Sequence, residues 1–192
     1  MKKVLALVLC LLLCLTAAAE TAEFSILGGA VTWSTTADEA MEIFGEGTTR
    51  TDDYDPAVGS AATLTVEGLG MFGLQTERVA LAYFNDELFA VYCYFGGLSD
   101  EAQSALIEKV SEVCGKAKYL RDTDLSLVDY ILSMAGVSAQ KTLCEWDGLS
   151  GTSALFVRES GSNGPDSYHL AFENAAVSEK IDKAFGVSEP AR

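Results

Sequence analysis

The sequence predicts an α+β fold, in which an antiparallel sheet of about six short strands has helices packed on one face, after a cleavable N-terminal signal peptide. The first observation is the stretch from Val79 to Phe95, where two runs rich in aromatic and branched side chains flank Asn85 and Asp86. This pattern is typical of a β-hairpin, because such turn residues tolerate positive φ. The second observation is the order of the expected elements, namely helix, three strands, helix, and then helix, three strands, helix. Strands that follow one another through tight turns favour an antiparallel sheet.

The first nineteen residues have the outline of a secretory signal peptide. Lysines at positions 2 and 3 precede an unbroken apolar run from Val4 to Leu15, and alanines at 17–19 supply small residues for cleavage. As a helix, this run would span roughly 18 Å, less than the ~30 Å hydrocarbon core of a bilayer, so a transmembrane anchor is disfavoured. We therefore expect cleavage near Ala19 and a secreted or periplasmic protein of the cell envelope. Lipid attachment at Cys14 is an alternative to free secretion, although Leu13 stands where a small residue is usual.

The composition indicates one acidic domain. The chain has 192 residues with a net charge of −15, from 13 basic and 28 acidic side chains. Loss of the signal peptide removes Lys2 and Lys3, so that the charge becomes −17 over residues 20–192. Such a chain repels nucleic acid and anionic lipid. We expect a single domain, in which 36–115 and 124–185 are two possible half-repeats, and scattered acids that form a solvated surface rather than a docking face.

The elements of the first half follow from local signals. A short extended segment covers 20–27, and Thr36 to Glu39 form a capping box for a helix over 37–44 that ends at Gly45. Residues 45–60, rich in glycine and aspartate, are predicted to form a loop, and 63–72 a strand interrupted by two glycines. The hairpin follows, and Ser99 then caps a second helix, which Gly115 ends.

The second half is predicted in the same way. Asp124 caps a third helix that ends at Gly136. Short strands are expected over 142–146, 153–158 and 168–172, separated by turns of small and polar residues. A last helix is expected over 175–185, with Val177, Ile181 and Phe185 facing inward.

Three cysteines remain after the signal peptide: Cys93, Cys114 and Cys144. One disulfide with a free thiol and three buried thiols both fit this number. We expect Cys93 and Cys144 to be core residues of strands. The sequence has no Cys-x-x-Cys motif and no Cys/His cluster, so zinc binding and thioredoxin-like redox chemistry lack their ligands.

Two parts of the chain resemble a known family. One is Gly28 to Trp33, followed by Thr36 to Ala40 and Gly45; the other is Phe72-Gly73, which leads into Ala82 to Asp86, with Leu88, Tyr92 and Phe95 after it. Together they resemble secreted bacterial proteins of the β-lactamase-inhibitor-like group, which includes small outer-membrane assembly lipoproteins. The resemblance covers about residues 28–120 and departs from the family at Ser34-Thr35 and Glu87. It implies a helix-on-sheet scaffold that binds other proteins through its sheet face or loops, without naming the partner.

Two short motifs match enzyme signatures but lack the expected context. Gly68 to Gly73 matches G-x-G-x-x-G, yet a strand rather than a helix is predicted after it, so a dinucleotide site is disfavoured. Ser138 to Lys141 matches Ser-x-x-Lys, but it follows a helix-ending glycine and precedes a strand. We interpret the first as a strand with glycine bulges and the second as a connecting loop.

Two further sets of residues have side chains of the types that bind metal ions or act as general bases. Asp52, Asp53 and Asp55 carry oxygens that suit Ca²⁺, but their spacing does not fit an EF-hand loop. His169, the single histidine, has the residue type of a general base. It lies on a predicted strand, and no nucleophile–base pair is evident in the sequence, so a structural or surface role is favoured. We predict no catalytic, metal-binding or cofactor-binding residues.

The hairpin supplies the candidate binding face. One alternating set holds Tyr83, Leu88, Ala90, Tyr92 and Tyr94, and both this set and its alternate are apolar. Tyrosine is amphipathic and common where proteins bind, so Tyr83, Leu88, Tyr92 and Tyr94 are predicted to form a partner-binding face. Burial of both faces, by the acidic loop and the C-terminal segment, is the alternative.

The predicted function is that of a non-enzymatic module that binds another protein of the envelope or extracellular space. The alternative is a receptor for a small molecule or cell-wall fragment, which would use a cavity between sheet and helices. The predicted partners include no nucleic acid, and we expect no transmembrane span. The sequence alone does not determine the oligomeric state.

Overall fold

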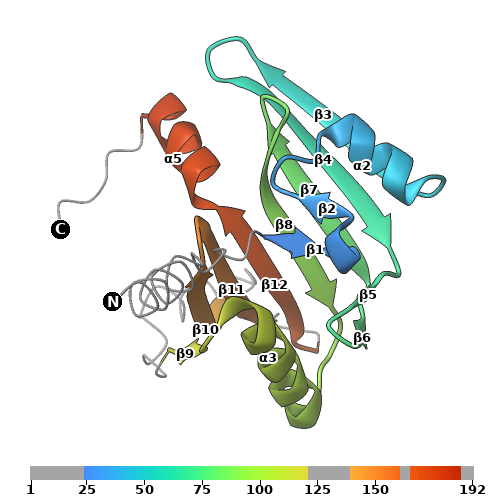
Figure 1. Ribbon diagram of the computed structural model, residues 1–192, viewed down its shortest axis with the longest axis vertical. Coiled ribbons are helices and arrows are strands. Elements are labelled where there is room, and N and C mark those ends of the chain that lie inside the picture. The colour runs from blue at the N-terminus through green and yellow to red at the C-terminus, as the bar shows by residue number, and fades with distance from the viewer. Residues whose placement is uncertain (1–23, 121–138, 161–164, 187–192) are drawn as a thin grey trace, which may run out of the picture.

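The structure, a computed structural model, describes residues 24–120, 139–160 and 165–186. Its main feature is an antiparallel sheet of eight strands in the order β3-β4-β7-β8-β12-β11-β10-β9 (Figure 1). The strands, in that order, are β3 (Thr49–Asp55), β4 (Gly59–Glu67), β7 (Arg78–Phe84), β8 (Glu87–Phe95), β12 (Ser167–Asn174), β11 (Thr152–Ser160), β10 (Ala139–Leu149) and β9 (Lys118–Tyr119). The central pair, β8 and β12, joins the N-terminal and C-terminal halves of the chain.

Shorter elements accompany the sheet. Two small hairpins pair β1 (Ser25–Ile26) with β2 (Val31–Thr32) and β5 (Gly70–Met71) with β6 (Leu74–Gln75), and a 3-10 turn, η1 (Leu27–Gly29), joins β1 to β2. The α-helices of the described residues are α2 (Ala37–Phe44), α3 (Asp100–Cys114) and α5 (Ala175–Ala184).

The prediction of an α+β fold with about six short strands is wrong. The described chain is mostly sheet, with eight strands in one sheet and four more in the two hairpins. The clearest miss is the segment 45–60, predicted as a loop, because it contains β3 and the turn into β4. All seven residues of β3 are exposed, so no apolar alternation marks this edge strand. It pairs with β4, and its Arg50 forms an ion pair with Asp38 of α2 at 2.8 Å. Beyond residue 138 the strands are also longer than predicted.

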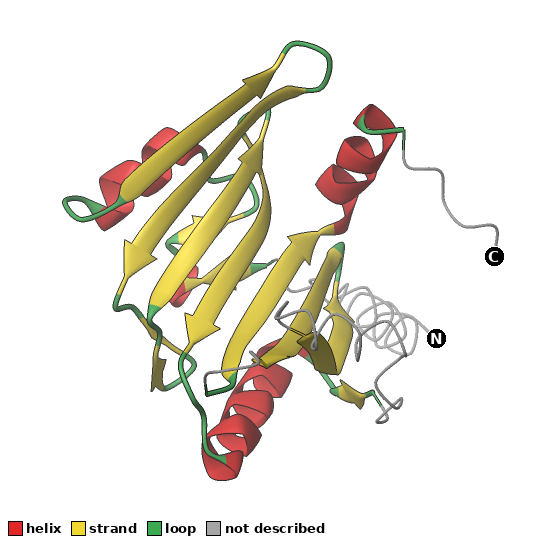
Figure 2. Ribbon diagram, turned by 180° about the vertical axis from the view of Figure 1, so that it is seen from behind, coloured by secondary structure: helices red, strands yellow, loops and turns green. Residues whose placement is uncertain are grey.

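The two faces of the sheet differ in what covers them. The helices α2 and α3 and the β1–β2 hairpin lie in front of the sheet in Figure 1 and behind it in Figure 2. The hydrophobic core lies beneath them and includes Leu64, Leu81, Phe95 and Phe156, which are at most 1% exposed. We call this the covered face. The opposite face, which Figure 2 presents to the viewer, has no helix of the described chain across its centre, and we call it the open face.

Several local predictions are confirmed. The side chains of Thr36 and Glu39 form the predicted capping box of α2, and the hydroxyl of Ser99 accepts the backbone N–H of Ala102 at the start of α3. Asn85 and Asp86, with φ of 49° and 63°, form the predicted turn between β7 and β8.

The last helix ends at Ala184, and Phe185, predicted to face inward, is 62% exposed. The signal peptide and the helix predicted from Asp124 to Gly136 lie outside the described residues.

A β-bulge in the central hairpin decides which residues face the core. Ala82 pairs with Ala90 and Tyr83 pairs with Leu88, so Phe89 is an extra residue without a partner on β7. An extra residue shifts the alternation of side chains by one position. Leu88 therefore lies on the same face as Val91, Cys93 and Phe95, rather than on the face of Tyr92 and Tyr94.

Candidate binding face

The structure divides the four residues that the sequence assigned to one binding face. Tyr83 and Leu88 are 1% and 0% exposed and belong to the core under α2, where the Tyr83 hydroxyl donates to the carbonyl oxygen of Thr36 at 3.4 Å. Tyr92 and Tyr94 lie on the open face and are half-buried. The prediction of a shared face is therefore wrong for Tyr83 and Leu88, because strict alternation along the hairpin does not account for the bulge at Phe89.

The two remaining tyrosines line a hollow of about 590 Å³ on the open face. Its residues come from five adjacent strands, β7, β8, β12, β11 and β10. They are Arg78, Tyr92, Tyr94, Gln140, Thr142, Leu155, Val157, Glu159, His169, Ala171 and Glu173. We call this site the open-face hollow.

Strand pairing brings the members of the hollow together in rows. One row crosses all five strands, because each member is the register partner of the next: Arg78, Tyr94, His169, Val157 and Thr142. Directly opposite residues of antiparallel strands share a face of the sheet. Residues far apart in the sequence thus become neighbours.

Three rings occupy the centre of the hollow. The ring centroids of Tyr94 and His169 lie 5.7 Å apart, those of Tyr92 and Tyr94 lie 6.3 Å apart, and those of Tyr92 and His169 lie 6.4 Å apart in an edge-on arrangement. The guanidinium carbon of Arg78 lies 4.3 Å from the centroid of the Tyr94 ring, which is a cation–π contact. We call Tyr92, Tyr94 and His169 the aromatic cluster.

Two carboxylates act on this cluster. Burial lowers the pKa of His169, and the nearby charge of Glu159 opposes that shift. Burial also raises the pKa of Tyr92, to which the charges of Glu173 and Tyr94 add. His169 is therefore mainly neutral near pH 7, and the Tyr92 hydroxyl stays protonated. The centre of the hollow is thus uncharged and aromatic, with acidic side chains on β11 and β12 close by.

Several titratable side chains line the hollow. The imidazole of His169 and the carboxylates of Glu159 and Glu173 line the hollow, and the ring neighbours of His169 are two tyrosines. A raised pKa makes the Tyr92 hydroxyl a poorer nucleophile near neutral pH. The sequence had pointed to His169 without its neighbours, and it missed Arg78, Glu159 and Glu173. These residues are brought together by strand pairing, and strand pairing leaves no recognisable pattern within a short stretch of the sequence.

The other motifs of the sequence serve the fold. Residues 68–73 connect β4 to the small β5–β6 hairpin, where Phe72 and Gly73, with φ of 51° and 81°, form the turn. The side-chain amide of Gln75 donates to the carbonyl oxygen of Gly68, which closes this loop. A strand, not a helix N-terminus, follows the glycines, so the dinucleotide interpretation fails. Lys141 lies within β10 opposite Arg158, whereas Ser138 lies outside the described residues.

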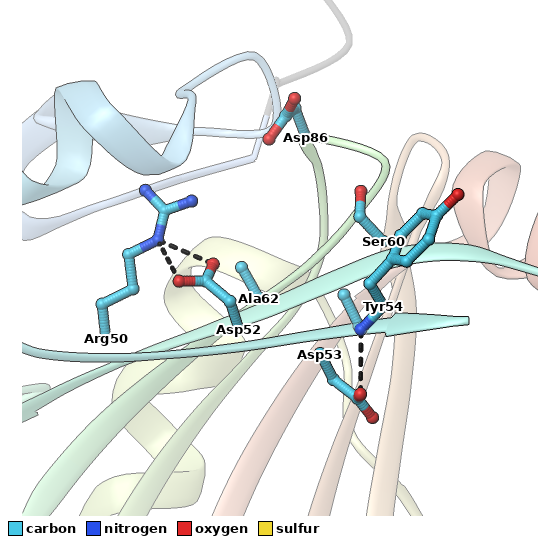
Figure 3. A pocket seen from close by; sticks show the side chains of 8 residues that line it. Arg50, Asp52, Asp53, Tyr54, Ser60, Ala62 and Asp86 are labelled. Atoms are coloured by element: carbon cyan, nitrogen blue, oxygen red, sulfur yellow. Dashed lines mark hydrogen bonds and ion pairs between the residues drawn. The ribbon is translucent and has the colours of Figure 1, made fainter. Parts of the chain in front are cut away.

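Each of the three aspartates of β3 accepts a hydrogen bond from a different partner. Figure 3 shows the small pocket beside them, of about 230 Å³, in which the guanidinium of Arg50 donates to Asp52 at 2.8 Å. Asp53 accepts the backbone N–H of Tyr54, and Asp55 accepts that of Ala57. Successive residues of a strand point to opposite faces, so the side chains of Asp52 and Asp53 leave β3 in opposite directions, although both residues border the pocket. Within the described residues, no group of three or more His, Cys, Asp or Glu side chains is arranged to hold a metal ion.

The three cysteines after the signal peptide are free, buried thiols. Cys93 and Cys144 are fully buried on β8 and β10, as predicted, and Cys114 ends α3. Burial raises the pKa of Cys93 and Cys144 to about 12 and that of Cys114 to about 11. Such thiols are protonated at neutral pH and act as small apolar core residues.

Two findings bear on the wider context of the chain. Across the described residues, no helix combines the length and the apolar character needed to cross a membrane. Comparison of the chain with models of protein families, with curated proteins and with solved structures finds no match.

Proposed function

We propose that the protein is a non-enzymatic binding module, and that its open-face hollow contacts another protein of the envelope or extracellular space. The observation that carries this proposal is the aromatic cluster, which is half-exposed on a sheet face that the described helices leave uncovered. An antiparallel sheet with one covered face ordinarily presents polar side chains on the other. Here Tyr92, Tyr94 and Leu155 keep apolar surface accessible instead.

The composition of the hollow supports a protein partner. Tyrosine and arginine are enriched at the centres of protein interfaces, because they bury large areas and still form hydrogen bonds. The hollow has both types in contact, as Arg78 stacks on Tyr94. Its floor contains small buried side chains such as Ala171, 3% exposed, so the rings beside them remain accessible.

A small ligand is a second candidate, and one observation favours it. A hollow of about 590 Å³ falls in the range of small-molecule pockets, and polar groups of Arg78, Gln140 and His169 border it. A cell-wall fragment is such a ligand. The site differs from the one that the sequence suggested, because core side chains fill the space between helices and sheet.

The proposed setting follows from the sequence. A signal peptide cleaved near Ala19 would deliver the protein to the periplasm or the cell exterior. The resemblance to the β-lactamase-inhibitor-like group, proposed for residues 28–120, also implies binding through a sheet face. Neither inference identifies the partner.

A quantitative capture experiment tests the proposal. The purified protein is immobilised, and envelope extract of its own host is passed over it at moderate salt. We expect a protein retained in stoichiometric amount by the wild type and lost from the double variant Tyr92→Ala/Tyr94→Ala. The matched control is Tyr54→Ala/Tyr119→Ala, which removes two tyrosines that are 71% and 70% exposed on the edge strands. Equal retention by all three proteins would contradict the proposed face.

A further inference from the structure

We propose that the outer edge of β3 binds an extended, basic segment of another protein, which adds a strand to the eight-stranded sheet. Three observations carry this inference: a long strand edge without a partner strand, backbone groups that point outward from it, and two carboxylates without a cation beside them. The edge is separate from the open-face hollow, whose lining begins two strands away at β7.

The strand β3 is the longer of the two edge strands of the described sheet (Figure 1). It has seven residues against two in β9, and it pairs with β4 from Thr49 to Asp55 without a bulge. Among the described strands, none pairs with the outer side of β3, and all seven of its residues are exposed. Such an edge is a template for a further strand, since its outward backbone groups lack a ladder partner.

The register of β3 on β4 identifies a backbone group that points outward. The carbonyl oxygen of Ser60 on β4 accepts the backbone N–H of Asn85, and the Ser60 N–H donates to the Asn85 side chain. Both groups of Ser60 thus face away from β3, and its register partner Tyr54 has no ladder bond to β4. The Tyr54 N–H donates instead to the carboxylate of Asp53 at 2.8 Å.

The same outward orientation recurs at every second residue of a strand, so the N–H and C=O groups of Arg50 and Asp52 also point away from β4. An incoming strand therefore meets backbone donors and acceptors at Arg50, Asp52 and Tyr54. The carbonyl oxygen of that strand can replace the Asp53 carboxylate on the Tyr54 N–H. This exchange releases Asp53 to pair with a cation of the partner.

The charges of β3 select a basic partner. Arg50 lies on the covered side of the strand, where its guanidinium contacts Asp52 and Asp38 of α2, both at 2.8 Å. Figure 3 shows Arg50 and Asp52 on one side of β3 and Asp53 on the other, and Asp55 shares the side of Asp53. Asp53 and Asp55 each accept an uncharged backbone N–H, and in the described chain neither has a cation at ion-pair distance. Two negative charges thus remain uncompensated along this edge.

The spacing of these carboxylates defines the pattern of the partner. Asp53 and Asp55 are two residues apart, so the cations opposite them in an antiparallel strand are also two residues apart. The residue between the cations lies opposite Tyr54 and exchanges backbone hydrogen bonds with it. The recognised segment is therefore an extended chain with the pattern basic–neutral–basic.

The same charges disfavour a second copy of this chain as the occupant. Charged side chains on an edge strand commonly prevent pairing between identical edges. A second β3 would bring its own uncompensated aspartates, on a chain of net charge −15. Like charges repel two such copies, whereas a basic strand is attracted, so the edge discriminates between these partners.

The test uses the blocked peptide Lys-Val-Lys-Thr-Val-Thr, whose two lysines are placed opposite Asp55 and Asp53. Binding to the purified protein is followed by NMR through the backbone amide signals of β3. We expect saturable shifts of the Arg50, Asp52 and Tyr54 amides. The peptide Glu-Val-Glu-Thr-Val-Thr should bind at least about tenfold more weakly, because its charges are repelled.

Backbone methylation of the peptide distinguishes strand addition from simple charge attraction. N-methylation of its fourth residue, opposite Asp52, removes an N–H that faces β3, whereas N-methylation of its fifth residue, opposite Thr51, removes one that faces away. We expect the first change to weaken binding by about tenfold, as the loss of one hydrogen bond implies, and the second by less than about twofold. Equal weakening by the two changes would exclude the proposed pairing.

A protein variant identifies the carboxylates that are responsible. Asp53→Asn/Asp55→Asn keeps the oxygens that accept the backbone N–H groups of Tyr54 and Ala57, and it should weaken the lysine peptide by roughly tenfold. The matched control is Asp100→Asn/Asp182→Asn, which removes the same charge from exposed positions of α3 and α5. This control should bind like the wild type.

Further outcomes would overturn the inference. Equal affinity for the lysine and glutamate peptides would show that the aspartates select nothing. A dimer in which the β3 amides are protected from hydrogen exchange before peptide is added would assign the edge to a second copy.

The inference and the proposed function fail separately. Tyr92→Ala/Tyr94→Ala should bind the lysine peptide like the wild type, since the hollow does not include β3. Loss of peptide binding in this variant would contradict an independent edge site. Tyr54→Ala keeps the backbone edge and both carboxylates, so it should bind the peptide and it remains a suitable control for the hollow.

Discussion

The same strands contribute side chains to the covered face and to the open face of the sheet, but the two faces differ in how deeply those side chains are buried. On β8, Cys93 and Phe95 are 0% and 1% exposed beneath the helices, while their neighbours Tyr92 and Tyr94 are half-exposed on the other side. On β11, Phe156 is fully buried on the covered face and Leu155 keeps contact with solvent on the open face. Both faces are rich in apolar residues, and among the described helices α2 and α3 pack against the covered face.

This difference separates residues that hold the fold from residues that keep accessible apolar surface. The covered face gains stability from complete burial, at about 25 cal/mol for each Å² of apolar surface. Tyrosines on the open face bury less area and contribute less to folding. A large half-exposed apolar group on a surface commonly marks an interaction site. The following experiments test the comparison, beginning with the largest expected effect.

Phe95 and Tyr94 are adjacent in sequence and lie on opposite faces. We expect Phe95→Ala to lower the free energy of unfolding by about 3–5 kcal/mol, because it leaves a cavity in the core. Tyr94→Ala should cost about 1 kcal/mol, for the lost ring and cation–π contacts. Urea unfolding followed by circular dichroism measures both. Similar costs for the two substitutions would mean that the faces are not distinct.

The stability cost of replacing Leu88 tests whether the β-bulge at Phe89 is present. With Leu88 0% exposed in the core, we expect Leu88→Ala to cost about 2–5 kcal/mol in the free energy of unfolding. Had alternation continued through Phe89, Leu88 would share the open face with Tyr92, and the substitution would cost less than about 1 kcal/mol. Phe89→Ala, at the half-buried bulge position, is the comparison and should cost less than Leu88→Ala. The same unfolding measurement distinguishes the two registers.

The capping box of α2 affects the covered face alone. Thr36→Ala removes the side chain that accepts the backbone N–H of Glu39, and we expect a loss of about 1 kcal/mol. The ring signals of Tyr92, Tyr94 and His169 should stay unchanged in NMR spectra. Thr49→Ala, at an exposed position of β3, is the control and should cost less than about 0.5 kcal/mol. A shift of the ring signals in Thr36→Ala would show that the two faces are coupled.

The titration midpoint of His169 reports on the burial of the aromatic cluster on the open face. Because burial lowers its pKa, we expect its ring signal to titrate below the ordinary value of about 6.5, and Glu159→Gln to lower the midpoint further. As the pH falls through about 6.5, the unfolded chain takes up the proton before the folded chain does, so stability falls and then levels off below the folded midpoint. The untagged chain has a single histidine, so one NMR signal settles the assignment. A midpoint above 6.5 would mean that the aromatic cluster is not desolvated.

Local sequence signals predicted most of the local structure. The capping box at Thr36, the cap at Ser99 and the turn at Asn85-Asp86 were correct because each depends on residues a few positions apart. The strand β3 was missed, because its stability comes from pairing with β4 and not from any apolar pattern of its own. The candidate site was half predicted: Tyr92 and Tyr94 lie in it, whereas Tyr83 and Leu88 are in the core.

The sequence by itself thus determined the caps, the central hairpin, the acidic charge and the buried character of Cys93 and Cys144. Tertiary structure alone decided the order of the eight strands and, through the bulge at Phe89, which tyrosines reach solvent. It also placed Arg78, Tyr94 and His169 in one row. The physical reason is that caps and turns form among neighbours in the chain, whereas a sheet face is assembled from strands that are distant in sequence and meet only through their backbone pairing.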